Sequence, residues 1–388
     1  MSGYKVNKKV EKLMNSFPDE ILEKIGRAHQ VDHNVSRLFG DRMFKLLIYA
    51  MSRSDRITTR YLEELYNESD LFRRISGKGA HQTRHSSLAD RINRMPVDYF
   101  AELFEWTLTK YGSYLEGHKT LSLIKRFDSS MIQIGAGLVD WGMDVGRKPD
   151  QGKGHKQLKL TLGFHGKLPG SIKTHLNQDY LSEEKALKHA IEQDNLGPED
   201  IIVFDRGLKS RKTLVEFDKA QLHFVTRGLK DLKYELIDSY RQIKGRKADD
   251  LTFLQDSKVY LFGRGNKPIK HEFRLVEVEV ESGKRLTFIT NIWDRSAMDI
   301  ARFYRRRWDI EVFFRILKQN LGVKHLFSRS ENGIQIQMYC ALIVATLLLV
   351  IKKRLNKSSI QIAKFQLEEN LLFMLFKDLE INRDPYGP

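Results

Sequence analysis

Cysteine is almost missing from this chain of 388 residues, in which Cys340 is the only one. A lone thiol excludes an intrachain disulfide and a zinc site built from several cysteines. Residues 1–17 also lack the apolar segment and the small-residue cleavage site of a secretory signal. These absences predict a protein of a reducing cytoplasm.

Long apolar runs are scarce as well. The longest extends from Met338 to Ile351, about fourteen residues, whereas a membrane-spanning helix needs roughly twenty. We therefore expect a buried core helix at this position and no membrane partner.

Acidic residues are outnumbered by basic ones. The chain has 66 Lys and Arg against 50 Asp and Glu, which leaves a net charge of +16. Such an excess makes a polyanion, above all nucleic acid, the leading partner. The apolar and aromatic content is that of an ordinary globular protein, and the length allows two or three domains.

The hydrophobic periodicity changes near residue 121. Before that point, apolar residues recur every three or four positions, which predicts helices with N-caps at Thr58 and Ser87. A DNA-binding helical domain and a plain helical bundle both fit this pattern. After it, the pattern predicts a mixed α/β sheet whose later strands are parallel. The expected strands are 123–134, 155–165, 170–176, 200–208 and 223–228, and the expected helices are 182–193 and 210–220.

The segment that follows this sheet is rich in alternating, strand-like stretches. A last helical signal covers residues 231–243, and the strand patterns 257–265, 271–281 and 284–291 come after it. The predicted domains are therefore a helical N-terminal domain at 1–117 that is a candidate for DNA binding, a core at 118–228 and 292–355, a β-rich insertion at 229–291, and a C-terminal helical tail at 356–388.

The stretch ARFYRRRWDIEVFFRILKQNLG, residues 301–322, sets acidic side chains among many basic ones. Ser296 with Asp299 forms the pattern of a capping box, and Gly322 stands where a helix would stop, so one helix is predicted between them. At about 100° per residue, a single face of this helix presents four polar groups. They are Tyr304, Arg307, Glu311 and Lys318. A salt-bridged surface helix explains the same pattern.

Two aspartates, Asp128 and Asp205, are predicted to end core strands. A lone Asp after a strand is usually a turn or cap residue, but carboxylates at neighbouring strand ends also form metal sites. If the helix that carries Glu311 packs on the sheet, the three acids converge. Their carboxylates would then be ligands for two Mg²⁺ ions, which phosphodiester chemistry uses. Basic neighbours would then hold the DNA strand. The candidates for DNA contact are Tyr304, Arg307, Lys318, Arg206 and Arg315.

The spacing Tyr304, Arg307, Glu311, Lys318 resembles the Tyr-Arg-Glu-Lys signature of bacterial insertion-sequence transposases of the IS-four family. The stretches FDSS around Asp128 and VFDRG around Asp205 resemble the two aspartate motifs of the same DDE enzymes. The resemblance covers roughly residues 125–353. It implies a ribonuclease H-like catalytic core, interrupted by a β-rich insertion between Asp205 and Glu311 and preceded by an all-helical N-terminal domain.

The activity that this resemblance implies is transposition. A homodimer would bind the terminal inverted repeats of the element in double-stranded DNA and cut there with Mg²⁺, for which Mn²⁺ is an expected substitute. It would then join the freed 3′-hydroxyls to target DNA, in the cytoplasm and nucleoid of a bacterium. Asp128, Asp205 and Glu311 would be both the catalytic residues and the metal ligands.

Two other functions fit parts of the pattern. A nuclease or resolvase would use the same metal chemistry to cut DNA without joining ends to a new site. A catalytically silent DNA-binding protein derived from a transposase is the third possibility. The three acids argue against it, because a protein that only binds DNA has no use for acidic side chains beside a polyanion that repels them.

Overall fold

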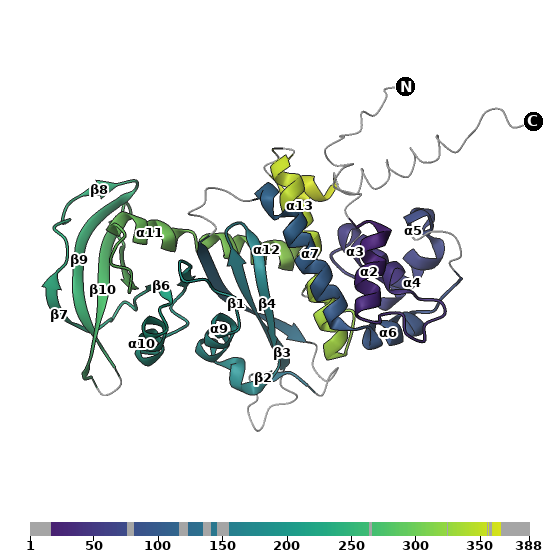
Figure 1. The fold of residues 1–388 in the computed structure, drawn as a ribbon, viewed down its shortest axis with the longest axis horizontal. Helices are drawn as coiled ribbons and strands as arrows, with labels where there is room; N and C mark the ends of the chain where they lie inside the picture. Colours follow the sequence, from purple (N-terminus) through teal and green to yellow (C-terminus); the bar gives the residue numbers. More distant parts are fainter. Residues whose placement is uncertain are drawn as a thin grey trace, which may run out of the picture. The chain divides into compact units, whose positions relative to one another are not determined.

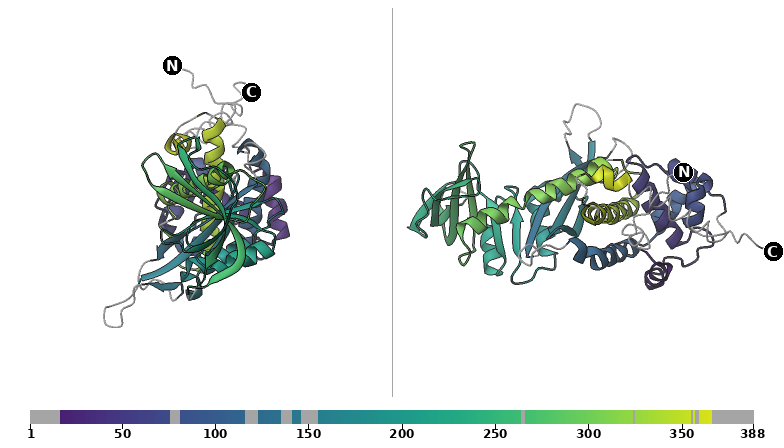
Figure 2. Two further views of the ribbon diagram at one scale, coloured as in Figure 1. Left: turned by 90° about the vertical axis from the view of Figure 1, so that its left-hand side faces the viewer. Right: turned by 90° about the horizontal axis from the view of Figure 1, so that it is seen from above.

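The computed structural model describes residues 17–75, 81–115, 123–134, 141–145, 155–263, 266–323, 325–354, 356 and 359–365. Residues 1–16, which enter the prediction about secretion, and most of the predicted C-terminal tail lie outside these ranges. Contacts divide the chain into two compact units. One unit consists of residues 116–313, and the other joins residues 1–115 to residues 314–388 (Figures 1 and 2).

The unit that joins residues 1–115 to residues 314–388 is helical. Its described helices are α2 (Asp19–Ala28), α3 (Gly40–Arg53), α4 (Thr59–Glu68), α5 (Asp70–Ile75), α6 (His85–Arg94), α7 (Val97–Leu115) and α13 (Glu331–Arg354). The predicted cap at Thr58 is confirmed, since its side chain accepts a hydrogen bond from the N–H of Tyr61. The predicted cap at Ser87 is wrong. Helix α6 begins earlier, where the carboxylate of Glu63 accepts the N–H of His85 at 2.9 Å.

Helix α13 contains the long apolar run, and it is longer than the run predicts. Its residues Glu331–Lys353 are long and apolar enough by composition to cross a membrane, yet 83% of an apolar 18-residue part of this stretch is buried inside the protein. The helix packs against α7, α3 and α6, and Asn332 donates hydrogen bonds to the carbonyls of Ile92 in α6 and of Met95 just after it. The predicted core helix therefore exists, but its partners are N-terminal helices, whereas the sequence-based division assigns it to the catalytic core.

The other unit is built on one mixed sheet. Its strands are β1 (Ile124–Ile134), β2 (Met143–Val145), β3 (His155–His165), β4 (Leu168–His175), β5 (Ile201–Phe204), β6 (His223–Arg227), β7 (Tyr234–Ser239), β8 (Lys247–Ala248), β9 (Leu251–Phe262), β10 (Pro268–Val280) and β11 (Arg285–Thr290). Its helices are the 3₁₀ turn η1 (Gln178–Leu181), α9 (Glu183–Glu192), α10 (Arg211–Lys219), α11 (Ala297–Arg305) and the first turns of α12 (Trp308–Asn320).

The strand order among the described residues is β2-β3-β1-β5-β6-β11-β10-β9-β7, with β4 beside β3 and β8 beside β9. Strand β1 is antiparallel to β3 and parallel to β5, and β5 is parallel to β6, which confirms the predicted mixed sheet with parallel later strands. The β-rich strands join the same sheet through β11, which pairs with β6. The helical signal over residues 231–243 is wrong, because β7 forms the sheet edge there.

Helices cover both faces of this sheet, as Figure 1 shows. Along β5, Ile201 and Val203 pack into the cluster that contains α11, while Ile202 and Phe204 point to the side of α9 and α10. This alternation follows from the two-residue period of a strand. Ile124 of β1 also lies on the α11 side, so the even-numbered residues of β1 face the same way at this point.

The predicted single helix over the basic stretch is interrupted. Helix α11 ends at Arg305 and α12 starts at Trp308, with a turn at Arg306 and Arg307. The N–H of Arg307 bonds to the carbonyl of Tyr304 at 2.9 Å, which is the i to i−3 pattern of a 3₁₀ turn. The predicted capping box at Ser296 and the left-handed Gly322, with φ of +62°, are confirmed. The break changes the angular relation between Tyr304 and Glu311 that a continuous helix would impose.

Candidate active site

The register of β1 and β5 places two carboxylates side by side. Their parallel pairing ends with Phe127 opposite Phe204, so Asp128 is the next residue of β1 and Asp205 is the first residue after β5. Strand β1 continues to Ile134 along β3, which corrects the prediction that Asp128 ends its strand. What ends there is the pairing with β5, and the two acids flank the point where these strands part.

Tyr304 connects α11 to this pair. Its hydroxyl donates a hydrogen bond to Oδ1 of Asp205 at 2.9 Å. Its ring packs on Phe288 of β11, with the ring centroids 5.0 Å apart. The aromatic contact fixes the ring on the sheet, so the hydroxyl is aimed at one oxygen of Asp205 and leaves the other oxygen free of this bond.

Arg307 lies between the remaining acids. Nη1 is 3.7 Å from Oδ2 of Asp128, and Nη2 is 2.5 Å from Oε1 of Glu311. Its side chain is only 12% exposed, and its buried Nε has no hydrogen-bond partner among the described residues. One guanidinium thus brings Asp128 of the sheet and Glu311 of α12 to a common point, and its position is the turn that separates the two helices.

Burial and charge set different ionisation behaviour for the two aspartates. Burial is the main cause that raises the pKa of Asp128 from 3.8 to about 6, against the opposing effects of the Ser129 N–H and the Arg307 charge. Burial also acts on Asp205, but the Arg206 N–H, the Arg307 charge and the Tyr304 hydroxyl outweigh it, so the pKa of Asp205 is lowered. Of the two, Asp205 holds its negative charge more firmly.

Two charged residues near the acids were not predicted as site residues. Arg126 precedes Asp128 by two positions on β1; it is fully buried, with Nη1 3.5 Å from Oδ2 of Asp309 at the start of α12. It also donates to the carbonyl of Gly166. A charged residue inside a predicted core strand was the available signal for it, because such a charge needs a partner.

Glu183, the first residue of α9, is the second charged residue near the acids that was not predicted. Its charge contributes to the raised pKa of Asp128, and its carboxyl group lies where a Cβ on Gly207 would stand. Glycine at position 207 leaves room for this close approach, and a larger residue there would displace the Glu183 side chain. Nothing in the sequence separates Glu183 from an ordinary acidic residue in the first turn of a helix.

The other predicted residues are less closely engaged. Nε of Arg206 is 4.0 Å from Oδ1 of Asp205, and its side chain is 40% exposed. Arg315 and Lys318 are on the later turns of α12, which belong to the helical unit. Their contact with DNA stays a prediction.

The acids were also predicted to hold metal. Among the residues that the structure describes, no group of three or more His, Cys, Asp or Glu side chains is close enough together to hold an ion. Arg307 pairs with both Asp128 and Glu311 instead and balances their charge. The donor set itself consists of carboxylate oxygens, which are the ligands that Mg²⁺ and Mn²⁺ take, so the residues present fit such an ion.

Comparisons with known proteins agree with the geometry. A protein-family profile described as "Transposase DDE domain" matches residues 126–347, a range that contains all three acids. The putative transposase y4zB of Sinorhizobium fredii is 31% identical over 285 residues, which are 72% of this chain and 74% of that protein.

Two further relatives are more distant. The probable transposase for insertion sequence element IS5377 of Geobacillus stearothermophilus is 24% identical over 70% of this chain and 68% of its own length. The putative transposase for insertion sequence element IS4SA of a Synechocystis strain is 27% identical over 73% of this chain and 76% of its own length.

The opposite pKa shifts predict opposite effects of neutralising the two aspartates. Because the folded-state pKa of Asp128 is raised to about 6, the folded chain holds an extra proton between about pH 4 and 6, and the free energy of unfolding falls as pH rises through that window. Asp128→Asn should therefore gain stability over wild type by roughly 2 kcal/mol at pH 8 relative to pH 4.

Asp205→Asn is the matched control, and its sign is reversed. The pKa of Asp205 is lowered, so its charge stabilises the fold above the unfolded pKa, and this contribution is lost as pH falls. The variant should be less stable than wild type at pH 8 and approach it at low pH. Urea unfolding in EDTA at several pH values measures the free energy of unfolding of both variants and of wild type. Equal pH dependence of the two variants would contradict the electrostatic description of the site.

Proposed function

Because the chain belongs to the transposase DDE domain family, we propose that it cuts DNA at the terminal inverted repeats of an insertion sequence and transfers the freed 3′-hydroxyls to target DNA. The mixed α/β fold is the ribonuclease H-like fold of that family. We also assign the chain to the IS-four branch, on the spacing of Tyr304, Arg307, Glu311 and Lys318. A homodimer would hold the two ends of the element together.

The observation that carries the proposal is the convergence of three acids from distant parts of the chain. Asp128 and Asp205 follow the last β1–β5 pair, and Glu311 is joined to Asp128 through one guanidinium. A stable fold gains nothing from collecting three carboxylates, whose mutual repulsion must be balanced. A reaction at phosphorus, where positive charge must be held against an anionic backbone, does require them.

Asp128, Asp205 and Glu311 are the residues that would hold divalent metal, with Mg²⁺ as the expected ion and two ions per site. When bound, the metal supplies the charge that activates an attacking hydroxyl and stabilises the leaving oxygen at the scissile phosphate. Of the two aspartates, Asp205 is the more strongly disposed to ionise, because its pKa is lowered while that of Asp128 is raised.

The neighbouring side chains have separate tasks. Tyr304 holds one oxygen of Asp205 through its hydroxyl and so fixes the orientation of that carboxylate. Arg307 pairs with Asp128 and Glu311 in the structure. A phosphate of the bound DNA strand would replace these carboxylates as its partner, since the guanidinium fork suits phosphate as well as carboxylate. Arg126 anchors the first turn of α12 to the sheet through Asp309. Arg206, Arg315 and Lys318 would contact the backbone of the same DNA.

The helical unit offers a second surface for DNA. A groove with a volume of about 930 Å³ lies between the α2–α3 connection and the start of α6. Its lining includes four arginines and two acids, and one of these acids, Glu63, is already bonded to His85. The exposed side chains of Arg37 and Arg84 have no ion pair or hydrogen bond within the described part of the chain. We propose that this groove binds phosphates of the terminal repeat, as the net charge of +16 favours.

Glu311→Gln tests the catalytic proposal. The change removes a carboxylate from the site and leaves its size unchanged, so cleavage of a labelled duplex with the flanking terminal repeat should fall by roughly 10²–10³-fold or more in Mg²⁺. DNA affinity should be retained or slightly increased, because a negative charge is lost. The measurement is single-turnover nicking with and without EDTA.

Glu192→Gln provides the control for that experiment, because Glu192 also pairs with a basic side chain one helical turn away, Lys188 at 3.7 Å, but on α9. It should cut at the wild-type rate. Cleavage by Glu311→Gln at the wild-type rate would show that Glu311 takes no part in the reaction. If the wild-type protein cuts but does not join 3′-ends to target DNA, it is a nuclease or resolvase.

Arg37→Ala and Arg84→Ala test the groove. Each should weaken binding to the terminal repeat and lower the slope of log affinity against log salt by about 0.9, the value for one phosphate contact. Arg27→Ala is the matched control, since Arg27 is exposed on α2 but pairs with Glu23 at 3.9 Å. Fluorescence anisotropy at several salt concentrations gives the slopes. Unchanged slopes for both groove variants would exclude this surface from the DNA complex.

A further inference from the structure

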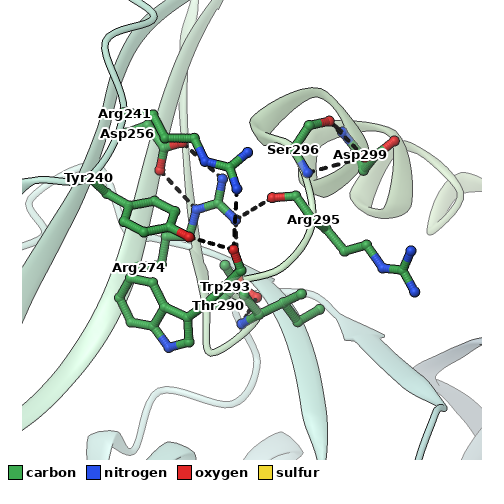
Figure 3. A network of polar contacts seen from close by, with 10 residues as sticks. Tyr240, Arg241, Asp256, Arg274, Thr290, Trp293, Arg295, Ser296 and Asp299 are labelled. Atoms are coloured by element: carbon green, nitrogen blue, oxygen red, sulfur yellow. Dashed lines mark hydrogen bonds and ion pairs between the residues drawn. The ribbon is translucent and has the colours of Figure 1, made fainter.

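A buried polar network joins the β-rich strands to the segment that leads into α11 (Figure 3). At its centre, Arg274 of β10 donates from Nε and Nη2 to the two carboxylate oxygens of Asp256 on β9, both at 2.8 Å. Both side chains are 0% exposed. The remaining Nη1 donates to the carbonyls of Ile292 at 2.9 Å and Arg295 at 2.7 Å. One guanidinium therefore fixes a strand pair and a turn at the same time.

The same turn is held at a third carbonyl. The Tyr240 hydroxyl donates to the carbonyl of Trp293 at 2.6 Å, and its ring meets the Trp293 ring edge to face at 5.1 Å. The Arg274 cation lies 4.9 Å from the centre of the Tyr240 ring. As Figure 3 shows, Arg274 reaches the turn from β10 and Tyr240 from the residue after β7. Residues 292–295 are thus fixed through their backbone, whatever their own side chains do.

Helix α11 begins immediately after this fixed turn. Ser296 and Asp299 form a capping box, in which each side chain accepts the backbone N–H of the other residue. The helix then runs for nine residues, and Tyr304 in its last turn bonds to Asp205. Since a helix is a stiff rod with a rise of about 1.5 Å per residue, a shift at its start is transmitted to Tyr304 and to the following Arg307.

Stability alone is a weak reason for such a network. A buried ion pair is often no better for stability than apolar residues of similar volume, because both charges lose their hydration. Its four directed bonds do give what an apolar pair cannot, namely a single position for the turn. Arg274 is also too deeply buried to touch DNA itself.

We propose that Arg274, paired with Asp256, is a positioning residue for the cleavage reaction. It fixes the start of α11 through the carbonyls of Ile292 and Arg295, and so sets where Tyr304 meets Asp205 and where Arg307 meets the other acids. This role rests on the cleavage activity proposed above. It makes the β-rich strands part of the catalytic machinery, because the cation that aligns α11 belongs to them.

The first test replaces the pair in two ways. Arg274→Lys keeps a charge for Asp256 but loses the fork, and the double change Arg274→Met with Asp256→Leu supplies an apolar pair that can maintain stability. Both should lower the single-turnover cleavage rate by roughly ten- to a hundredfold, the cost of a small misplacement, while DNA affinity stays within about twofold. Thermal unfolding monitors the folded fraction.

The matched control is Asp249→Asn. Asp249 pairs with Arg302 of α11 at 3.1 and 3.2 Å, so it also joins the β-rich strands to this helix, but on the exposed surface. An exposed pair contributes little, and this variant should cut like wild type. Equal losses in the control and the Arg274 variants, or losses that only follow the folded fraction, would overturn the proposal.

A double-mutant cycle with Tyr304→Phe shows whether Arg274 acts through Tyr304. If it does, adding Tyr304→Phe to Arg274→Lys should lower the rate far less than the product of the two separate losses. If the double variant shows the full product of the two separate losses, Arg274 does not act through Tyr304.

Amide hydrogen exchange over residues 297–305 tests the same idea without relying on cleavage. It should accelerate in the Arg274 variants and not in Asp249→Asn. Unchanged exchange would overturn the positioning role even if cleavage fell. A wild-type protein that does not cut, with exchange altered as expected, would instead refute the proposed function and keep the structural role of Arg274.

Discussion

The balance of charge around Arg307 is the constraint on which the site depends. Asp128, Asp205 and Glu311 come from two strands and a helix to the surroundings of this one guanidinium, and neighbouring carboxylates are stable only beside positive charge. In the structure a guanidinium provides that charge by pairing with two of them. The arrangement suits the proposed reaction on DNA, because an incoming phosphate would compete for Arg307 and would leave the carboxylates to bind metal.

The sheet positions the two aspartates, and two buried arginines hold the helices on either side of the turn at Arg307. Strand alternation directs Ile201 and Val203 toward α11, and the β1–β5 register adds Asp128 and Asp205 where the pairing ends. Arg126 then ties α12 to β1 through Asp309, and Arg274 ties the start of α11 to the β-rich strands. The turn at Arg306 and Arg307 lies between these anchors, so a break in the helix is compatible with a fixed site.

Sequence patterns were sufficient where local structure decides. Strand 155–165 was predicted with the bounds of β3, and the parallel direction of β5 and β6 followed from the helices between the strands. Other features depend on contacts distant in sequence. Residues 234–239 form a strand because β9 offers a partner edge, and the helix over 301–322 breaks at a site where Arg307 finds two acids. Arg274 was missed for the same reason, since the turn that it holds lies 18 residues or more further along the chain.

The central claim is that these carboxylates hold the metal that cuts DNA, and a change of ligand softness tests it most directly. Asp205→Cys replaces an oxygen ligand by sulfur, which disfavours Mg²⁺ but accepts Mn²⁺. Nicking of the terminal repeat by this variant should be lost in Mg²⁺ and partly restored in Mn²⁺, while wild type cuts with both ions. Equal loss with both ions in a folded, DNA-binding variant, or full activity in Mg²⁺, would contradict the account.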